Sequence, residues 1–174
     1  MRIHRIFEVL KERLYAASYQ DKRINILQDI QDKWSDVIYL EEFFESNKED
    51  LQSGFFGEIT IDEAIDQTIE EAEELFERLY EEDGSNLEQM FQPLDNREYR
   101  VVNFQKNKAK GSERKSWLRI YAVHFDDQYV ITGGTIKLTH QMEDRAHTQH
   151  ELDKLNIVRD ALKLNEADDL FVDV

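Results

Sequence analysis

The spacing of the hydrophobic residues changes at Pro93, the only proline in the chain. Before Pro93 they recur every three or four residues, which is typical of helices that bury one face. After it they alternate with polar residues, which is typical of half-buried strands. The two patterns occupy separate halves of the chain and predict an α+β fold. We expect a helical N-terminal half packed on an antiparallel three- to four-stranded sheet, with a C-terminal helix.

The N-terminal half is predicted to contain one strand and several helices. Residues 12–19 have strand-like spacing, although the segment before them also fits the spacing of a helix. A helical pattern begins at Ile24. The clearest helix follows Thr60, because Thr60 and Glu63 form a capping-box pattern and acids crowd the first turns. Gly84 is predicted to mark the end of this helix.

Three strands are predicted after the proline, at residues 98–104, 116–125 and 128–138. The first two are joined by a polar segment interpreted as a hairpin loop, and the last two by a tight turn. The three strands should therefore form an antiparallel meander. A final helix is predicted from about residue 148, where Thr148 and Glu151 match a second capping box.

Length and composition predict a single domain of residues 1–174. Its predicted parts are a mainly helical acidic part at 1–92, an antiparallel sheet plus helix at 93–163, and an acidic tail at 164–174. The chain has no cysteine, so disulfides and thiolate metal sites are excluded. Because no early apolar segment and no bilayer-spanning run is found, we expect a cytoplasmic protein with no membrane partner.

The net charge of −16 is distributed unevenly. Residues 41–100 hold 20 acidic and 4 basic side chains, whereas residues 101–124 hold 1 acidic and 6 basic ones. The acidic block is interpreted either as solvated helix surface or as a surface that docks a basic partner. The basic segment has the opposite sign and suits contact with phosphates.

The basic side chains gather in the predicted loop and in the strand that follows it. In that strand, alternation places Trp117, Arg119, Tyr121 and Val123 on one face, which is interpreted as aromatic and basic. The predicted RNA-binding residues of the loop are Lys106, Lys108, Lys110, Arg114 and Lys115. With Arg119 and Lys137 they are expected to form one continuous positive surface. The alternative interpretation is a solubilising loop.

Two glycines, at positions 133 and 134, interrupt the third predicted strand. They do not match a phosphate-binding loop, because the chain continues as strand instead of entering a helix. Glycine within a strand marks a bulge or a close backbone approach. We therefore expect a bend that brings Lys137 and His140 toward Arg119 and Tyr121. The missing side chains should also leave room for a nucleotide near the backbone.

Three histidines, His140, His147 and His150, fall within eleven residues. Three imidazoles could ligate zinc. Their spacing matches no known ligand pattern, so no metal and no other cofactor is predicted. A single histidine can still act as an acid or base near neutral pH.

The segment from about residue 90 to residue 163 resembles the RelE/HigB-type toxins of bacterial toxin–antitoxin pairs. The segments that carry the resemblance are "FQPLDNREYRVVNF", "WLRIYAV", "VITGGTIKLTH" and the helix "HTQHELDKLNIVRDAL". Proteins of Bacteroides-type bacteria with "RIYAIR…ITGGAIKLT" are similar too. Arg119 matches the strand arginine of the family, and Lys137 matches the first of its paired lysines. Leu138 stands where the family has the second lysine.

The resemblance implies a metal-independent endoribonuclease that cuts mRNA, often on the ribosome, by activating a ribose 2′-hydroxyl. Its protein partner would be a cognate antitoxin. Lys137 or His140 would be the general base, and Arg119 would stabilise negative charge. Tyr121 would pack or position a proton, and His147 would be the acid. The alternative is a non-catalytic interaction or regulatory protein of such a pair, whose acidic helices bind a basic partner.

Overall fold

The structure of the chain is a computed structural model. It describes all residues except 21, 82–83, 96–102, 113–114, 165–170 and 173–174. The strands are β1 (Ile3–Leu10), β2 (Leu14–Tyr19), β3 (Phe91–Pro93), β4 (Gln105–Lys110), β5 (Leu118–Phe125), β6 (Gln128–Ile136) and β7 (Phe171–Val172). The helices are α1 (Ile26–Trp34), α2 (Val37–Ser46), α3 (Lys48–Leu51), α4 (Ile61–Leu79), α5 (Leu87–Met90), the 3₁₀ helix η1 (Met142–Asp144) and α6 (Ala146–Lys163).

The seven strands that the structure describes form one sheet, in the order β3-β4-β5-β6-β2-β1-β7. Neighbours are antiparallel except β2 with β6 and β1 with β7, which are parallel. The α+β class is therefore confirmed. The prediction of an antiparallel sheet of three to four strands is wrong, because the sheet is larger and mixed. The difference comes mainly from the N-terminal hairpin β1–β2, which extends the meander beyond β6.

The strand predicted at residues 12–19 is confirmed by β2, which is buried along its whole length. Successive residues of a strand face opposite sides, so a strand buried at every position is covered on both. The strand β1 was not predicted, because the segment "FEVLKERL" also has helical spacing. Residues 171–172, within the segment predicted as tail, pair with β1 as β7.

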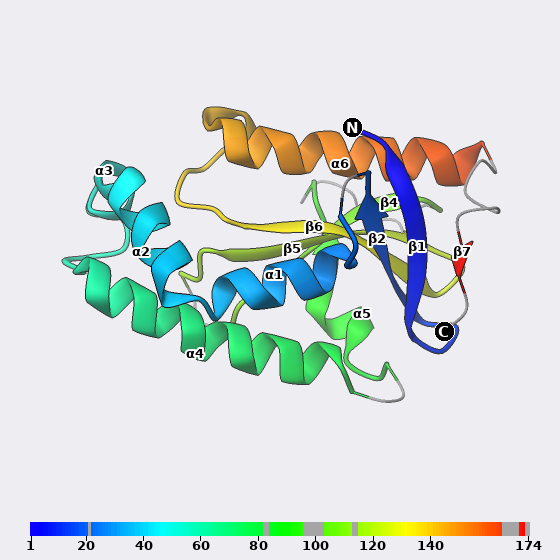
Figure 1. Cartoon of the computed structure of the whole chain (residues 1–174), viewed down its shortest axis with the longest axis horizontal. Coiled ribbons are helices and arrows are strands. Elements are labelled where there is room, and N and C mark those ends of the chain that lie inside the picture. Colours follow the sequence, from blue (N-terminus) through cyan, green and yellow to red (C-terminus); the bar gives the residue numbers. More distant parts are fainter. Residues whose placement is uncertain (21, 82–83, 96–102, 113–114, 165–170, 173–174) are drawn as a thin grey trace.

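Helices cover both faces of the sheet: α1 and α4 lie on one side and α6 runs along the other (Figure 1). Two adjacent residues of β6 face these two layers. A Cβ atom at Gly133 would meet Glu151 of α6, whereas a Cβ atom at Gly134 would meet Ile30 of α1. The glycine pair therefore lets one helix approach each face of the strand.

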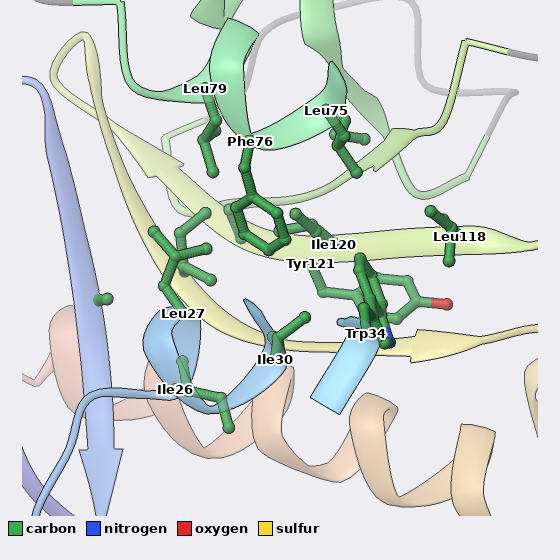
Figure 2. Packing of buried hydrophobic residues seen from close by; sticks show 14 of the residues in the cluster. Ile26, Leu27, Ile30, Trp34, Leu75, Phe76, Leu79, Leu118, Ile120 and Tyr121 are labelled. Carbon is green, nitrogen blue, oxygen red and sulfur yellow. The ribbon is translucent and has the colours of Figure 1, made fainter. Parts of the chain in front are cut away.

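The main core lies between the sheet and the helices α1 and α4 (Figure 2). There Ile30 and Trp34 of α1 and Phe76 of α4 pack over Ile120 of β5. The ring centroids of Trp34 and Phe76 are 6.0 Å apart. Burial of such large apolar side chains is the main favourable contribution to folding.

The two predicted capping boxes have different outcomes. At α4 the box is confirmed, because the Oγ1 atom of Thr60 accepts a hydrogen bond from the backbone N–H of Glu63 at 3.1 Å. At α6 it is wrong. The helix begins at Ala146, and the hydroxyl of Thr148 is buried and donates to the carbonyl of Arg145 at 2.9 Å. Glu151 is buried in the helix, only 5% exposed.

The first predicted strand of the meander, at 98–104, falls mostly on residues outside those described. The segment after it was predicted to be a loop, but it forms the strand β4. Gln105, Asn107 and Ala109 are buried in β4, and the lysines between them are more exposed. The alternation was missed because two of the three inward residues are polar. The amide of Asn107 donates to the carbonyl of Gln105 at 3.1 Å.

Candidate functional site

Basic side chains of β4 and β5 share the face of the sheet that carries α6. Lys108 lies opposite Tyr121, and Lys110 lies opposite Arg119. Tyr121 also lies opposite Gly133, the glycine that faces α6. Cross-strand partners project to the same side of a sheet, so the four side chains lie on one face.

Trp117 does not share this face, so its predicted grouping with Arg119 and Tyr121 is wrong. It precedes β5 by one residue and belongs to the core beneath α4. Its indole Nε1 donates to the Oγ1 atom of Thr68 at 2.9 Å. Its ring lies 5.6 Å from the ring of Phe44, centroid to centroid.

Two adjoining cavities, of about 610 and 580 Å³, lie over the basic face. Lys108, Arg119, Lys137 and His140 line both of them. Lys106 and Tyr121 line only the first cavity, and Lys110 and Lys115 line only the second. We call this surface the basic groove, formed by Lys106, Lys108, Lys110, Lys115, Arg119 and Lys137. The structure thus brings together most of the cations predicted from the sequence.

The cations of the basic groove are held mainly by backbone carbonyl groups. The Nη1 atom of Arg119 donates to the carbonyls of Ser116 at 2.7 Å and Leu118 at 2.9 Å. The Nζ atom of Lys137 donates to the carbonyl of His140 at 2.7 Å. No ion pair within the described part of the chain involves Lys110, Arg119 or Lys137. Their positive charge remains available to an anion.

The electrostatics of the groove are those of crowded, partly buried cations. Burial, together with the nearby charges of Lys110, Lys137 and Arg119, lowers the pKa of Lys108 to about 8. The pKa values of Lys110 and Lys137 are also lowered, first by burial and then by neighbouring cations. Since a bound anion would relieve this repulsion, the groove is suited to a ligand with several negative charges.

Acidic residues at the rim of the second cavity are engaged elsewhere. The carboxylate of Asp50 accepts hydrogen bonds from Nε and Nη2 of Arg145 at 2.9 and 2.8 Å. The Oδ2 atom of Asp144 accepts from the backbone N–H of Gln141 at 3.0 Å. Neither carboxylate forms an ion pair with a cation of the groove within the described residues, although the charge of Asp144 acts to raise the pKa of Lys137.

Tyr121 and His140 lie within the site in different ways. Tyr121 is 1% exposed, and its hydroxyl has no hydrogen-bond partner in the described part of the chain. Burial raises the pKa of Tyr121, so its phenol stays protonated and can donate a hydrogen bond. His140 lines both cavities, and its ring lies 5.6 Å from the ring of Phe55.

His147, predicted as the catalytic acid, is not brought to the groove. Its Nε2 atom lies 3.1 Å from the carbonyl oxygen of Ile136, and its ring packs against Phe43 at 5.4 Å. Both His147 and His150 line a third cavity of about 460 Å³ between α1 and α6.

The described residues contain no group of three or more His, Asp or Glu side chains that could hold a metal ion.

Of the two predictions for the glycines of β6, the bulge is confirmed and the room for a nucleotide is not. A bulge is present, because Tyr121 lies opposite Gly133 but Ala122 lies opposite Ile131, which leaves Thr132 as an extra residue. The expected room for a nucleotide is wrong. Side chains of α1 and α6 occupy the space beside both glycines. Close helix packing, and not ligand access, is what requires glycine there.

The residues predicted to bind RNA do not all lie where the sequence placed them. Lys106, Lys108 and Lys110 lie on the strand β4 and not in a hairpin loop, so alternation fixes their common direction. Arg114 lies outside the described residues. Lys115 lies beside the groove, and its Nζ atom donates to the carbonyl of Phe55 at 2.9 Å.

Phe55 lines the second cavity but was not predicted as a site residue. Its segment, "SGFFGEI", precedes the helix predicted to follow Thr60. Two adjacent aromatic residues between glycines in a polar surrounding were the signal available in the sequence.

Comparisons with family models, curated proteins and solved structures give no match to this chain. Within the described residues, no helix is long and apolar enough to cross a membrane.

Proposed function

We propose that the basic groove binds the phosphodiester backbone of RNA and that the chain is a RelE/HigB-like, metal-independent endoribonuclease acting on mRNA. The observation that carries this proposal is the shared wall of the two cavities. There Arg119 and Lys137, which no described ion pair neutralises, lie with Lys108 and His140. Side-chain cations are the usual ligands of nucleic-acid phosphates.

The chemistry follows from the same residues. A base removes the proton of a ribose 2′-hydroxyl, the 2′-oxygen attacks the adjacent phosphorus, and the bond from phosphorus to the 5′-oxygen breaks. The products are a 2′,3′-cyclic phosphate and a 5′-hydroxyl, whose oxygen takes its proton from solvent. Lys137 or His140 was predicted as the base. Lys108 joins them, because its pKa of about 8 leaves part of it unprotonated near neutral pH. Arg119, fixed by two carbonyls, would stabilise the negative charge that develops on the phosphate oxygens.

The proposal is tested by inducible expression of the wild type, Arg119→Ala, Lys137→Ala and, as a matched control, Lys11→Ala. Lys11 is exposed in the β1–β2 turn and lines none of the three cavities. We expect growth arrest and mRNA cleavage for the wild type and the control. Loss of one charge-stabilising group should slow cleavage by about 100-fold or more. Absence of cleavage by the purified wild type, alone and with ribosomes, would refute the enzymatic part.

Backbone binding is tested separately by the salt dependence of affinity for a single-stranded oligonucleotide. Each phosphate contact contributes about −0.7 to the slope of log K against log salt concentration. Lys110→Ala should reduce the slope by about that amount, whereas Lys11→Ala should leave it unchanged. An affinity that does not respond to salt would refute binding of the backbone by the groove.

The second candidate is a non-catalytic regulatory protein of a toxin–antitoxin-like pair. The observation that favours it is the outward face of α4, which is strongly acidic. Its exposed carboxylates are Asp62, Glu63, Asp66, Glu70, Glu73, Glu74 and Glu77. Salt-dependent RNA binding without cleavage, together with capture of a basic cognate protein, would support this candidate over the enzyme.

A further inference from the structure

An aromatic ring stands exposed beside the cations of the second cavity. Phe55 keeps 47% of its surface exposed, although large apolar side chains are usually buried. It lines the second cavity together with Lys110, Arg119 and Lys137. Tyr121, the aromatic residue predicted in the site, is 1% exposed and offers no ring face. Of the two phenylalanines that line this cavity, Phe55 is exposed and Phe56 is only partly exposed.

The backbone around Phe55 holds the ring outward. Gly54 and Gly57 have φ values of +104° and +81°, in the left-handed region that favours glycine. No heavy atom lies within 4 Å of a Cβ built at either glycine, so chain direction and not packing requires them. The two turns present the intervening pair of phenylalanines toward the groove, with Phe56 directed inward to Trp117 at 5.2 Å between ring centroids.

Phe56, His140 and the ammonium group of Lys115, which lies over the ring, hold the side chain of Phe55 in place, and the residue stays 47% exposed. Its centroid lies 4.9 Å from that of Phe56, at an interplanar angle of 89°, and 5.6 Å from that of His140 at 77°. The Nζ atom of Lys115 lies 5.0 Å from the centroid and donates to the carbonyl of Phe55. Because the ring is already ordered, binding a flat ligand against it costs little conformational entropy.

We propose that Phe55 is a stacking platform for an unpaired nucleobase whose neighbouring phosphate lies among Lys110, Arg119 and Lys137. The inference rests on the proposed RNA binding and narrows the ligand to single-stranded RNA. A base in a duplex has both faces covered by its neighbours, whereas an unpaired base can stack on an exposed aromatic ring. One cavity combines the two features that single-strand binding requires, a positive groove for the backbone and a ring for the base.

The test measures the affinity of a fluorescent single-stranded RNA with 2′-O-methyl riboses, which prevent cleavage. The same strand is compared with an abasic strand of equal length and with a duplex. Phe55→Ala should weaken binding of the single strand by roughly tenfold. It should leave binding of the abasic strand and of the duplex unchanged. Phe55→Trp should retain the affinity of the wild type, because a larger ring still stacks.

Tyr80→Ala is the matched control, since Tyr80 is also a partly exposed aromatic residue and lines none of the three cavities. Its affinity for all three ligands should match that of the wild type. Circular dichroism confirms that each variant is folded before binding is measured.

The possible results distinguish failure of base stacking on Phe55 from failure of the proposed RNA binding. If the wild type binds the single strand and Phe55→Ala binds it equally well, stacking is refuted while backbone binding stands. If Phe55→Ala weakens the abasic strand as much as the complete one, the ring supports the shape of the groove and does not contact a base. If the wild type binds none of the three ligands, the proposed RNA binding fails and the inference fails with it.

Discussion

Substitution of Gly133 by alanine tests how the sheet and α6 are fitted together. A Cβ atom at this position would overlap the Oε2 atom of Glu151 and lie 3.0 Å from its Cδ atom. Glu151 cannot simply turn away, because its other carboxylate oxygen accepts a hydrogen bond from Nζ of Lys154 at 2.8 Å in a buried ion pair. Either α6 moves away from β6 or the ion pair is disrupted.

The expected loss of stability depends on whether α6 moves or the ion pair between Glu151 and Lys154 breaks. Inserting a methyl group into a packed interior costs about 1–3 kcal/mol, and breaking a buried ion pair costs about 3–5 kcal/mol. The chain will take the cheaper route, so we expect Gly133→Ala to lower the free energy of unfolding by about 2–3 kcal/mol. Urea unfolding followed by the fluorescence of Trp34 and Trp117, which are both buried, measures this difference.

Gly133→Ala in a variant that lacks the ion pair shows whether the loss of stability comes from the clash with Glu151. Glu151→Ala with Lys154→Met removes the carboxylate and its cation together, so no buried charge is left unpaired. In that background Gly133→Ala should cost little, or stabilise by about 0.4–1 kcal/mol, because alanine reduces the freedom of the unfolded chain. An equal loss of stability in both backgrounds would contradict the packing explanation and place the cost in β6 itself.

Three further predictions concern other parts of the molecule. Thr68→Val removes the acceptor of the buried Trp117 indole N–H and should destabilise the protein by about 1–3 kcal/mol in urea unfolding, whereas Thr68→Ser should restore most of the loss. RNA affinity should fall as the pH rises through about 8, because Lys108 loses its proton, and Lys108→Arg should shift the fall to higher pH in a titration. The lowered pKa of Lys108 also means that the unfolded chain binds more protons between the folded and unfolded pKa values. Stability should therefore rise with pH there in the wild type, and this contribution should be missing in Lys108→Met.

The features that the sequence determined are local ones. The helix α4 was predicted with its capping box, because Thr60 and Glu63 lie one turn apart and the apolar stripe follows within the same segment. The strands β5 and β6 were predicted from alternation, and the helix α6 was predicted within two residues of its start, although its capping box is wrong. Each of these patterns acts over a few residues, so it can be recognised without knowing what it packs against.

The strand β4 could not be predicted from local patterns. Its lysines were predicted to lie in a loop because Gln105 and Asn107, which face inward, are not hydrophobic. Their burial depends on pairing with β5 and not on their own character. The candidate cations were thus named correctly in β4, but their shared direction came only from the sheet.

Tertiary structure alone decided which elements meet. The strand β2 pairs in parallel with β6, with Leu14 opposite Tyr129 and Ala16 opposite Ile131, and no local pattern encodes a partner so distant in the chain. The placement of Phe55 beside the basic groove has the same origin. A segment before α4 meets strands that follow Pro93 because the helices fold back over the sheet. The spacing of apolar residues predicts which side of a helix or strand is buried. The packing of the whole chain determines which other element covers that side.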